Sequence, residues 1–121
     1  MAAKKTLVLG ASPNPVRFSY KAVKSLQRHD IPVIPVGIRK GEIGGIEIIK
    51  DRPEIDDIHT ITMYIGPARQ KDYYSWLLSL HPKRIIFNPG TANTEFMKMA
   101  EKEGIEVLED CTLIMLNSGN Y

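Results

Sequence analysis

Two kinds of segment alternate along the chain, and this alternation constrains the fold more than any other feature. Short apolar runs rich in β-branched residues cover residues 6–9, 31–36, 58–65, 84–87 and 105–108. Amphipathic segments of helical period lie between them, at residues 16–29, after Pro67 with an apolar stripe of Tyr73, Trp76, Leu77 and Leu80, and at residues 94–103. Because strands that alternate with helices form parallel sheets covered on both faces, the sequence predicts an α/β protein.

The predicted architecture is a three-layer, Rossmann-like, doubly wound parallel sheet of about five strands in one domain, residues 1–121. Right-handed crossovers favour the strand order 3-2-1-4-5, with residues 6–9 at the centre. Glycines in residues 37–51 predict an irregular excursion with a short strand or hairpin at residues 46–49, and the apolar tail at residues 111–116 predicts a short helix over the sheet edge. In such a sheet a ligand binds outside the carboxyl ends of the strands, here between the first and fourth strands.

The turn after the first strand carries the residues of an anion site. Gly10, Ala11 and Ser12 lead toward the predicted helix, and Arg17 lies close to its start. A glycine lets backbone N–H groups approach a phosphate, Ser12 adds a hydroxyl, and the helix N-terminus offers unpaired donors at the positive end of its dipole. Arg17 adds a planar, always charged fork of donors. We expect these four residues to bind a phosphate-bearing ligand; the glycine by itself would equally serve a tight turn.

The end of the second strand narrows the choice of ligand. A NAD site needs G-x-G-x-x-G in the first turn and an acidic residue after the second strand. Here the turn lacks the second glycine, and the second strand ends in Val36 and Gly37, followed by Arg39 and Lys40. A cationic pair at this point suits a phosphate on or near the ribose, as in coenzyme A or NADP. These four residues are expected to contact such a cofactor, with a solvated loop as the alternative interpretation.

Further candidate contacts follow the third and fourth strands. They are Tyr64, Ile65, Gly66 and Gly90. The glycines would let a ligand lie against the backbone, or would serve only to end a strand. Asn88 and Asn93 would hydrogen-bond a ligand carbonyl, or cap the turn and the next helix. Both alternatives stay open for each of these residues.

The motifs G-A-S-x-x-P-x-R after the first strand, P-V in the second, N-P-G-T-A-N after the fourth and E-D-C after the fifth resemble the stand-alone coenzyme A-binding domain family. Members of this family are similar to the nucleotide-binding domain of succinyl-CoA synthetase. The resemblance covers about residues 5–116. It implies that residues 10–12 and Arg17 hold the pyrophosphate of coenzyme A or an acyl-CoA, while residues 36–40 and the segment after Tyr64 flank the adenosine end.

No complete catalytic apparatus is expected. The histidines His29, His59 and His81 fall at helix ends and at the start of a strand, away from the edge where a ligand is expected. The chain lacks the paired Cys/His spacing of a zinc site, so neither a catalytic triad nor a metal site is predicted. Cys111 follows Asp110 after the fifth strand, on the edge of the expected site. A lone cysteine is more often a small buried hydrophobe than an acyl acceptor, so binding without catalysis is the expected function.

The composition, 43% hydrophobic and 25% charged with a net charge of +2, is that of an ordinary globular protein. The sequence shows no basic stripe for nucleic acid, no apolar stretch long enough to span a membrane and no N-terminal apolar leader. The single Cys111 cannot form an internal disulfide. These features predict a cytoplasmic protein that binds a small-molecule nucleotide cofactor and neither nucleic acid nor membrane.

Two alternatives stay open. The first is an NADP-binding oxidoreductase subunit, against which the missing second glycine and the lack of a substrate domain argue. The second is an interaction or regulatory protein in which the nucleotide crevice is a remnant. Such a protein would form homo-oligomers or other contacts through Tyr73, Trp76 or the apolar tail.

Overall fold

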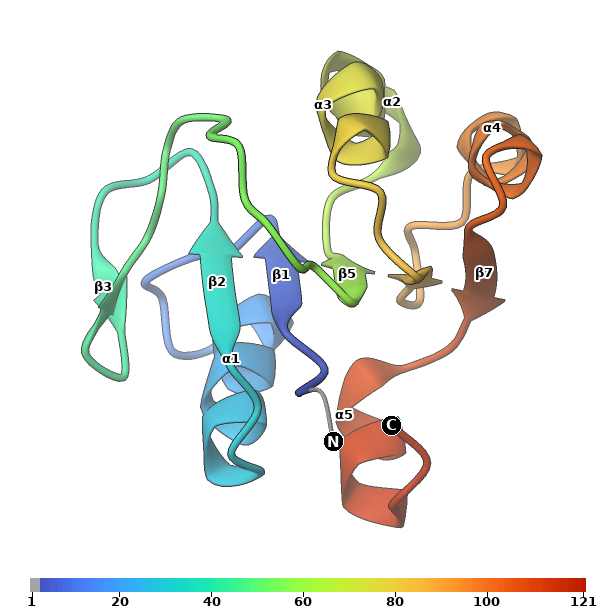
Figure 1. Cartoon of the computed structure of the whole chain (residues 1–121). Coiled ribbons are helices and arrows are strands. Elements are labelled where there is room, and N and C mark those ends of the chain that lie inside the picture. Colours follow the sequence, from blue (N-terminus) through green and yellow to red (C-terminus); the bar gives the residue numbers. More distant parts are fainter. Residues whose placement is uncertain (1–2) are drawn as a thin grey trace.

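A five-stranded parallel sheet forms the centre of the protein (Figure 1). The computed structural model describes residues 3–121. The strands of this sheet are β1 (Thr6–Leu9), β2 (Val33–Val36), β5 (Thr60–Met63), β6 (Arg84–Phe87) and β7 (Glu106–Glu109), and their order is β2-β1-β5-β6-β7. Every pairing between neighbours is parallel. The predicted fold class, a Rossmann-like α/β sheet, is confirmed.

The doubly wound pattern is as expected, but the third strand of the sheet, β5, takes a different place from the one in the order 3-2-1-4-5. It pairs with β1 instead of extending the sheet beyond β2. The outer edge of β2 is unsuited to a further full strand, because Pro35 lacks an N–H and its outward-pointing carbonyl accepts the N–H of Ile49. The point where the strand order reverses therefore lies between β1 and β5.

Helices cover both faces of the sheet. They are α1 (Phe18–Arg28), α2 (Pro67–Gln70), the 3₁₀ helix η1 (Lys71–Tyr73), α3 (Tyr74–Ser79), α4 (Thr94–Lys102) and α5 (Thr112–Ser118). In Figure 1, α1 and α5 lie side by side on one face, while α2, α3 and α4 lie on the other. The core is divided in the same way: Leu7 and Leu9 of β1 belong to the cluster under α3 and α4, and Val8 belongs to the cluster under α1. This is the three-layer arrangement that the alternation predicted.

The helix expected in the apolar tail is present as α5, but it packs beside α1 on one face of the sheet rather than over an edge. Thr112 at its start is buried, and its hydroxyl hydrogen-bonds the hydroxyl of Thr62 in β5 at 2.7 Å. The N–H of Thr112 donates to Oδ1 of Asn88 at 2.9 Å. These two bonds hold the start of α5 against the centre of the sheet.

The segment after β5 was expected to form one helix and is instead divided into α2, η1 and α3. The buried side chains of this segment are Gln70, Tyr74 and Leu77. Of the expected apolar stripe, only Leu77 is buried, and Tyr73, Trp76 and Leu80 are partly exposed. The 3₁₀ turn changes the phase of the helix and so changes which side chains face the core. As a result, residues of α2 and η1 turn toward the carboxyl ends of the strands.

The excursion after β2 contains the expected hairpin, formed by β3 (Glu42–Ile43) and β4 (Ile46–Glu47). Ile43 is fully buried against the α1 side of the core, and Nε2 of Gln27 donates to the carbonyl of Gly44 at 2.9 Å. The hairpin is thus attached to α1, and the loop before it is held over the end of β2.

Candidate ligand-binding site

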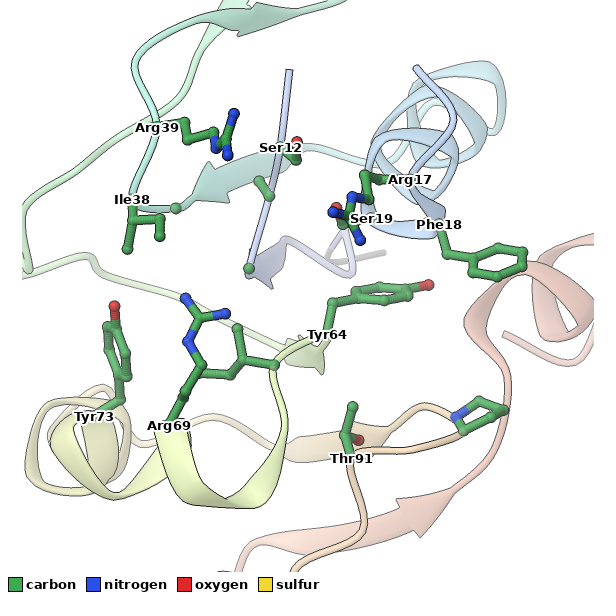
Figure 2. A pocket seen from close by; sticks show the side chains of 15 residues that line it. Ser12, Arg17, Phe18, Ser19, Ile38, Arg39, Tyr64, Arg69, Tyr73 and Thr91 are labelled. Carbon is green, nitrogen blue, oxygen red and sulfur yellow. The ribbon is translucent and has the colours of Figure 1, made fainter. Parts of the chain in front are cut away.

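A cavity of about 380 Å³ opens at the carboxyl ends of β1, β2 and β5, where the strand order reverses (Figure 2). Its walls come from the turn after β1, the start of α1, the loop after β2, the segment from the end of β5 through η1, and the loop after β6. The lining residues are Gly10, Ala11, Ser12, Arg17, Phe18, Ser19, Gly37, Ile38, Arg39, Tyr64, Ile65, Arg69, Tyr73, Pro89 and Thr91.

Most of the predicted binding residues lie together in this cavity. They are Gly10, Ala11, Ser12, Arg17, Gly37, Arg39, Tyr64 and Ile65. The structure leaves four others out of the lining. Val36 is buried beneath the cavity, Lys40 is exposed beyond Arg39, Gly66 is the N-cap of α2, and Gly90 borders a separate hollow.

The backbone of the turn after β1 is bonded differently from the expectation. The N–H groups of Gly10 and Ala11 both donate to the carbonyl of Val36, at 2.8 and 2.9 Å, so they are not free for a phosphate. Gly10 has φ +95, and a Cβ there would lie 2.8 Å from Cγ2 of Ile65. The glycine therefore serves a left-handed turn and a close packing of two loops, which was the alternative to phosphate contact.

Gly37 brings the loop after β2 against the same turn. A Cβ at this position would lie 2.1 Å from the carbonyl oxygen of Ala11, far inside any real contact. The N–H of Gly37 donates to the carbonyl of Ile49 at 3.0 Å, which fixes the loop from its other side. Only a residue without a side chain allows this approach, and the approach places Ile38 and Arg39 on the cavity wall.

The donors that remain free belong to the start of α1. Arg17 is the N-cap, no side chain caps the helix, and its first turn holds no acidic residue. The N–H groups of Phe18, Ser19 and Tyr20 have no acceptor within residues 3–121, as is usual for the first turn of a helix. The oxygen of Ser12 accepts the N–H of Asn14 at 3.1 Å, which leaves the Ser12 hydroxyl proton free to donate. The cavity thus has an unsatisfied set of donors at the positive end of a helix dipole.

The charge of the cavity is entirely positive. Arg17 is the N-cap of α1, Arg39 lies in the loop after β2 and Arg69 lies in α2. The lining contains no aspartate or glutamate. Within residues 3–121, none of the three side chains donates a hydrogen bond to another protein group. Arg69 was not predicted from the sequence. Its position at the third residue of the helix that follows Gly66 would have been the signal, because the helix start lies at the same edge of the sheet.

Apolar and aromatic side chains frame the outer part of the cavity. Ile38 is 62% exposed and Phe18 is 66% exposed, although both are large hydrophobic residues. The ring of Tyr73 also lines the cavity, and the guanidinium of Arg52 lies 4.4 Å from its centroid. Arg52 is itself fixed by a 2.7 Å hydrogen bond to the carbonyl of Asp72. Ile38 falls within residues 36–40, which the family resemblance places at the adenosine end. The lining residues that were not expected in the site, besides Arg69, are Phe18, Ser19, Tyr73, Pro89 and Thr91.

Tyr64 contributes its ring rather than a reactive hydroxyl. The hydroxyl oxygen is buried and has no hydrogen-bond partner within residues 3–121. Burial raises the pKa of Tyr64 above the usual value of 10.0, so the side chain is neutral near pH 7. Tyr64 is therefore unsuited to act as a general base.

A second hollow of about 230 Å³ lies beside the first, over the ends of β6 and β7, and Pro89 belongs to both. Gly90 and the half-buried Cys111 are among its lining residues. Asn88 is committed to the fold, because its amide donates to Oγ1 of Thr62 at 2.7 Å and to the carbonyl of Met63 at 2.8 Å. For Asn88, the structure thus supports the structural alternative rather than ligand contact.

The histidines stay apart from both hollows: none of His29, His59 and His81 is among their lining residues. Burial and the charge of Arg84 lower the pKa of His59. In the part of the chain that the structure describes, no group of three or more His, Cys, Asp or Glu side chains is arranged to hold a metal ion. Nor is any helix of residues 3–121 both long enough and apolar enough to cross a membrane.

Several solved structures have the same fold as this protein over most or all of its length. The crystal structure of an uncharacterized protein is 47% identical in sequence, covers 100% of both chains and gives a TM-score of 0.97. A protein from Thermus thermophilus is 24% identical, with 98% of this chain and 91% of that chain covered and a TM-score of 0.86. A hypothetical protein from Pyrococcus horikoshii OT3 is 25% identical, with 96% and 83% covered and a TM-score of 0.86. Among curated proteins, none matches the chain.

A family model supplies the remaining comparison. The model of the CoA binding domain matches residues 4–117 of the chain. This span includes every strand, every helix up to the last residue of α5, and every residue that lines the cavity. Because the match extends over nearly the whole chain, this protein belongs to the CoA-binding domain family.

Proposed function

We propose that this protein binds coenzyme A or an acyl-CoA in the cavity at the ends of β1, β2 and β5, and that it does so without catalysing a reaction. One observation carries the proposal: in a chain of this family, the cavity combines an uncapped helix start with three arginines and no carboxylate. Its volume of about 380 Å³ lies in the range of small-molecule sites, roughly 300–1,000 Å³.

The diphosphate of the ligand lies, in this proposal, against the first turn of α1. The N–H groups of Phe18 and Ser19 and the hydroxyl of Ser12 supply neutral donors, and Arg17 supplies a charged fork. Backbone donors at a helix start bind phosphate oxygens well because the helix dipole favours negative charge there. Hydrogen bonds from a guanidinium to phosphate are stronger than those between neutral groups.

The adenosine end is assigned to the side of the cavity formed by the loop after β2. Ile38 and Tyr73 offer apolar and aromatic surface for a base, and Arg39 offers a charge for a phosphate on the ribose. Lys40 follows Arg39 and would add to the positive potential there. NADP carries a ribose phosphate as well, so it is the comparison ligand that tests this assignment most severely.

The lining residues favour binding over catalysis. Apart from the three arginines, the ionisable side chains in the lining are Tyr64 and Tyr73. Proton transfer near pH 7 needs a group whose pKa lies near the working pH, such as histidine or a perturbed carboxyl, and the lining holds neither. We propose that the protein acts as a binding module, and we place it in the cytoplasm because its single cysteine cannot form an internal disulfide.

Isothermal titration calorimetry with coenzyme A, dephospho-coenzyme A and NADP tests the proposal. We expect saturable heat with coenzyme A and binding about tenfold weaker without the ribose phosphate, because a charged hydrogen bond to Arg39 is lost. The absence of heat with coenzyme A at millimolar concentration would contradict the proposal. Tighter binding of NADP than of coenzyme A would favour the oxidoreductase alternative instead.

A further inference from the structure

Arg69 enters the cavity from the wall opposite α1. Figure 2 shows its guanidinium pointing into the cavity from α2, while Arg17 and Ser19 lie on the α1 side. The lining contains no carboxylate, and Arg69 donates no side-chain hydrogen bond within residues 3–121. The guanidinium groups of Arg17 and Arg69 carry like charges and face the same cavity, so they repel each other. An anion bound between them would offset this repulsion. The arrangement fits a ligand with more than one negative charge at this point.

The residue next to Arg69 fixes the segment that carries it. Gln70 is fully buried, and its Nε2 donates to the carbonyls of Ile65 at 2.9 Å and Thr91 at 2.7 Å. Its Oε1 accepts a hydrogen bond from Nδ2 of Asn93 at 2.9 Å. One amide group thus joins α2 to the end of β5 and to the loop after β6, and both Ile65 and Thr91 line the cavity.

The two neighbours have opposite roles because successive residues of a helix point about 100° apart. Gln70 faces the protein interior and uses both of its donors and its acceptor there. Arg69 faces outward to the cavity and solvent. A buried amide whose partners are all on neighbouring loops is the means by which a short helix such as α2 keeps one orientation.

We propose that Arg69 is a specificity-determining residue that contacts the diphosphate of the ligand from the side opposite Arg17, and that Gln70 is the positioning residue that aims it. This inference rests on the proposed function, since it names a second contact for the same ligand. It makes the site selective for ligands that carry two adjacent phosphoryl groups, each met by one guanidinium.

Titration of Arg69→Ala with coenzyme A and with dephospho-coenzyme A tests the first part. Both ligands contain the diphosphate, so we expect affinity for each to fall by the same factor, about ten- to a hundredfold, with the lower end favoured because Arg69 is exposed. Lys71→Ala removes an exposed cation outside the lining of the cavity and should leave affinity unchanged. If only coenzyme A binds more weakly, Arg69 contacts the ribose phosphate and the inference is wrong.

Different results of these titrations would contradict the role of Arg69 and the proposed function. Unchanged affinity in Arg69→Ala, together with binding by the unsubstituted protein, would overturn the role of Arg69 and leave the proposed function standing. If the unsubstituted protein binds neither ligand, the proposed function itself fails.

A double-mutant cycle tests the positioning role of Gln70. Gln70→Met should lower the affinity for coenzyme A by a factor similar to that of Arg69→Ala, and should cause no further loss when added to Arg69→Ala. A purely structural role would lower affinity in both backgrounds and would contradict the inference, as would an unchanged affinity in Gln70→Met. If Gln70→Met fails to fold, Gln70→Asn provides the same comparison, because its shorter amide stays neutral and no longer reaches the carbonyls of Ile65 and Thr91.

Discussion

The close approach of Gly37 to Ala11 gives the sharpest prediction about how the fold builds the cavity. In Gly37→Ala the new Cβ would lie 2.1 Å from the carbonyl oxygen of Ala11, whereas real Cβ contacts are essentially never shorter than 3.0 Å. The Cβ is bonded directly to the backbone and the carbonyl oxygen is part of it, so no side-chain rotation relieves the clash. The two loops must therefore separate. Overpacking of this kind costs about 1–3 kcal/mol. We expect the melting temperature to fall by roughly 5–15 °C.

The same displacement should weaken ligand binding, because the loop that moves carries Ile38 and Arg39. Gly66→Ala is the matched control: a Cβ there meets no atom within 4 Å, and the φ of −70 suits any residue. Because Gly66 is the N-cap of α2 and alanine caps a helix less well than glycine, the control should lower stability by no more than about 1 kcal/mol, and it should leave binding intact. Thermal denaturation followed by circular dichroism, together with coenzyme A titration, measures both effects. Equal melting temperatures and affinities for the two variants would refute the steric reasoning.

Three further predictions follow from named contacts. Arg17→Ala should weaken coenzyme A binding about ten- to a hundredfold in calorimetry, whereas Arg28→Ala, at the other end of α1, should not; equal effects would assign the loss to net charge alone. Asn93→Ala should lower the free energy of unfolding in urea by about 2 kcal/mol, because Asn93 caps α4 and donates within the buried amide network; an unchanged urea midpoint would argue against both roles. Burial and Arg84 lower the pKa of His59 below 6.5, so the folded protein holds this proton less tightly than the unfolded chain and loses stability as the pH falls below that value. His59→Gln should therefore reduce the difference between melting temperatures measured at about pH 7.5 and about pH 5.5; a difference as large as in the unsubstituted protein would contradict this.

The fold class was predictable because the alternation of apolar runs and amphipathic segments persists along the chain. The position of β5 was not, because sheet order depends on which edges accept a further strand. The decisive contact is between Ile49 and Pro35, which closes the outer edge of β2 and joins segments whose pairing the local pattern does not reveal. The expected order 3-2-1-4-5 therefore differs from the structure in the place of one strand. As a result, the strand order reverses between the first and third strands of the sheet, β1 and β5, instead of between the first and fourth.

The candidate site was predictable where residues directly follow a strand and less so elsewhere. Arg39 was found by that rule, and Arg17 was found because it lies at the start of the first helix. Arg69 and Tyr73, by contrast, come from a helical segment that is divided by η1. Gly10 was placed correctly, but its N–H is bonded to Val36, a tertiary contact that the sequence does not encode locally. The edge of the sheet that carries the site was thus predictable from the sequence, whereas the packing of the loops decides which donors stay free.

A crystal structure of the protein with coenzyme A tests the central claim most directly. The claim predicts the diphosphate within hydrogen-bond distance of the Arg17 guanidinium and of the N–H groups that begin α1. Coenzyme A bound at another surface, with the cavity between β1, β2 and β5 filled only by solvent, would contradict it.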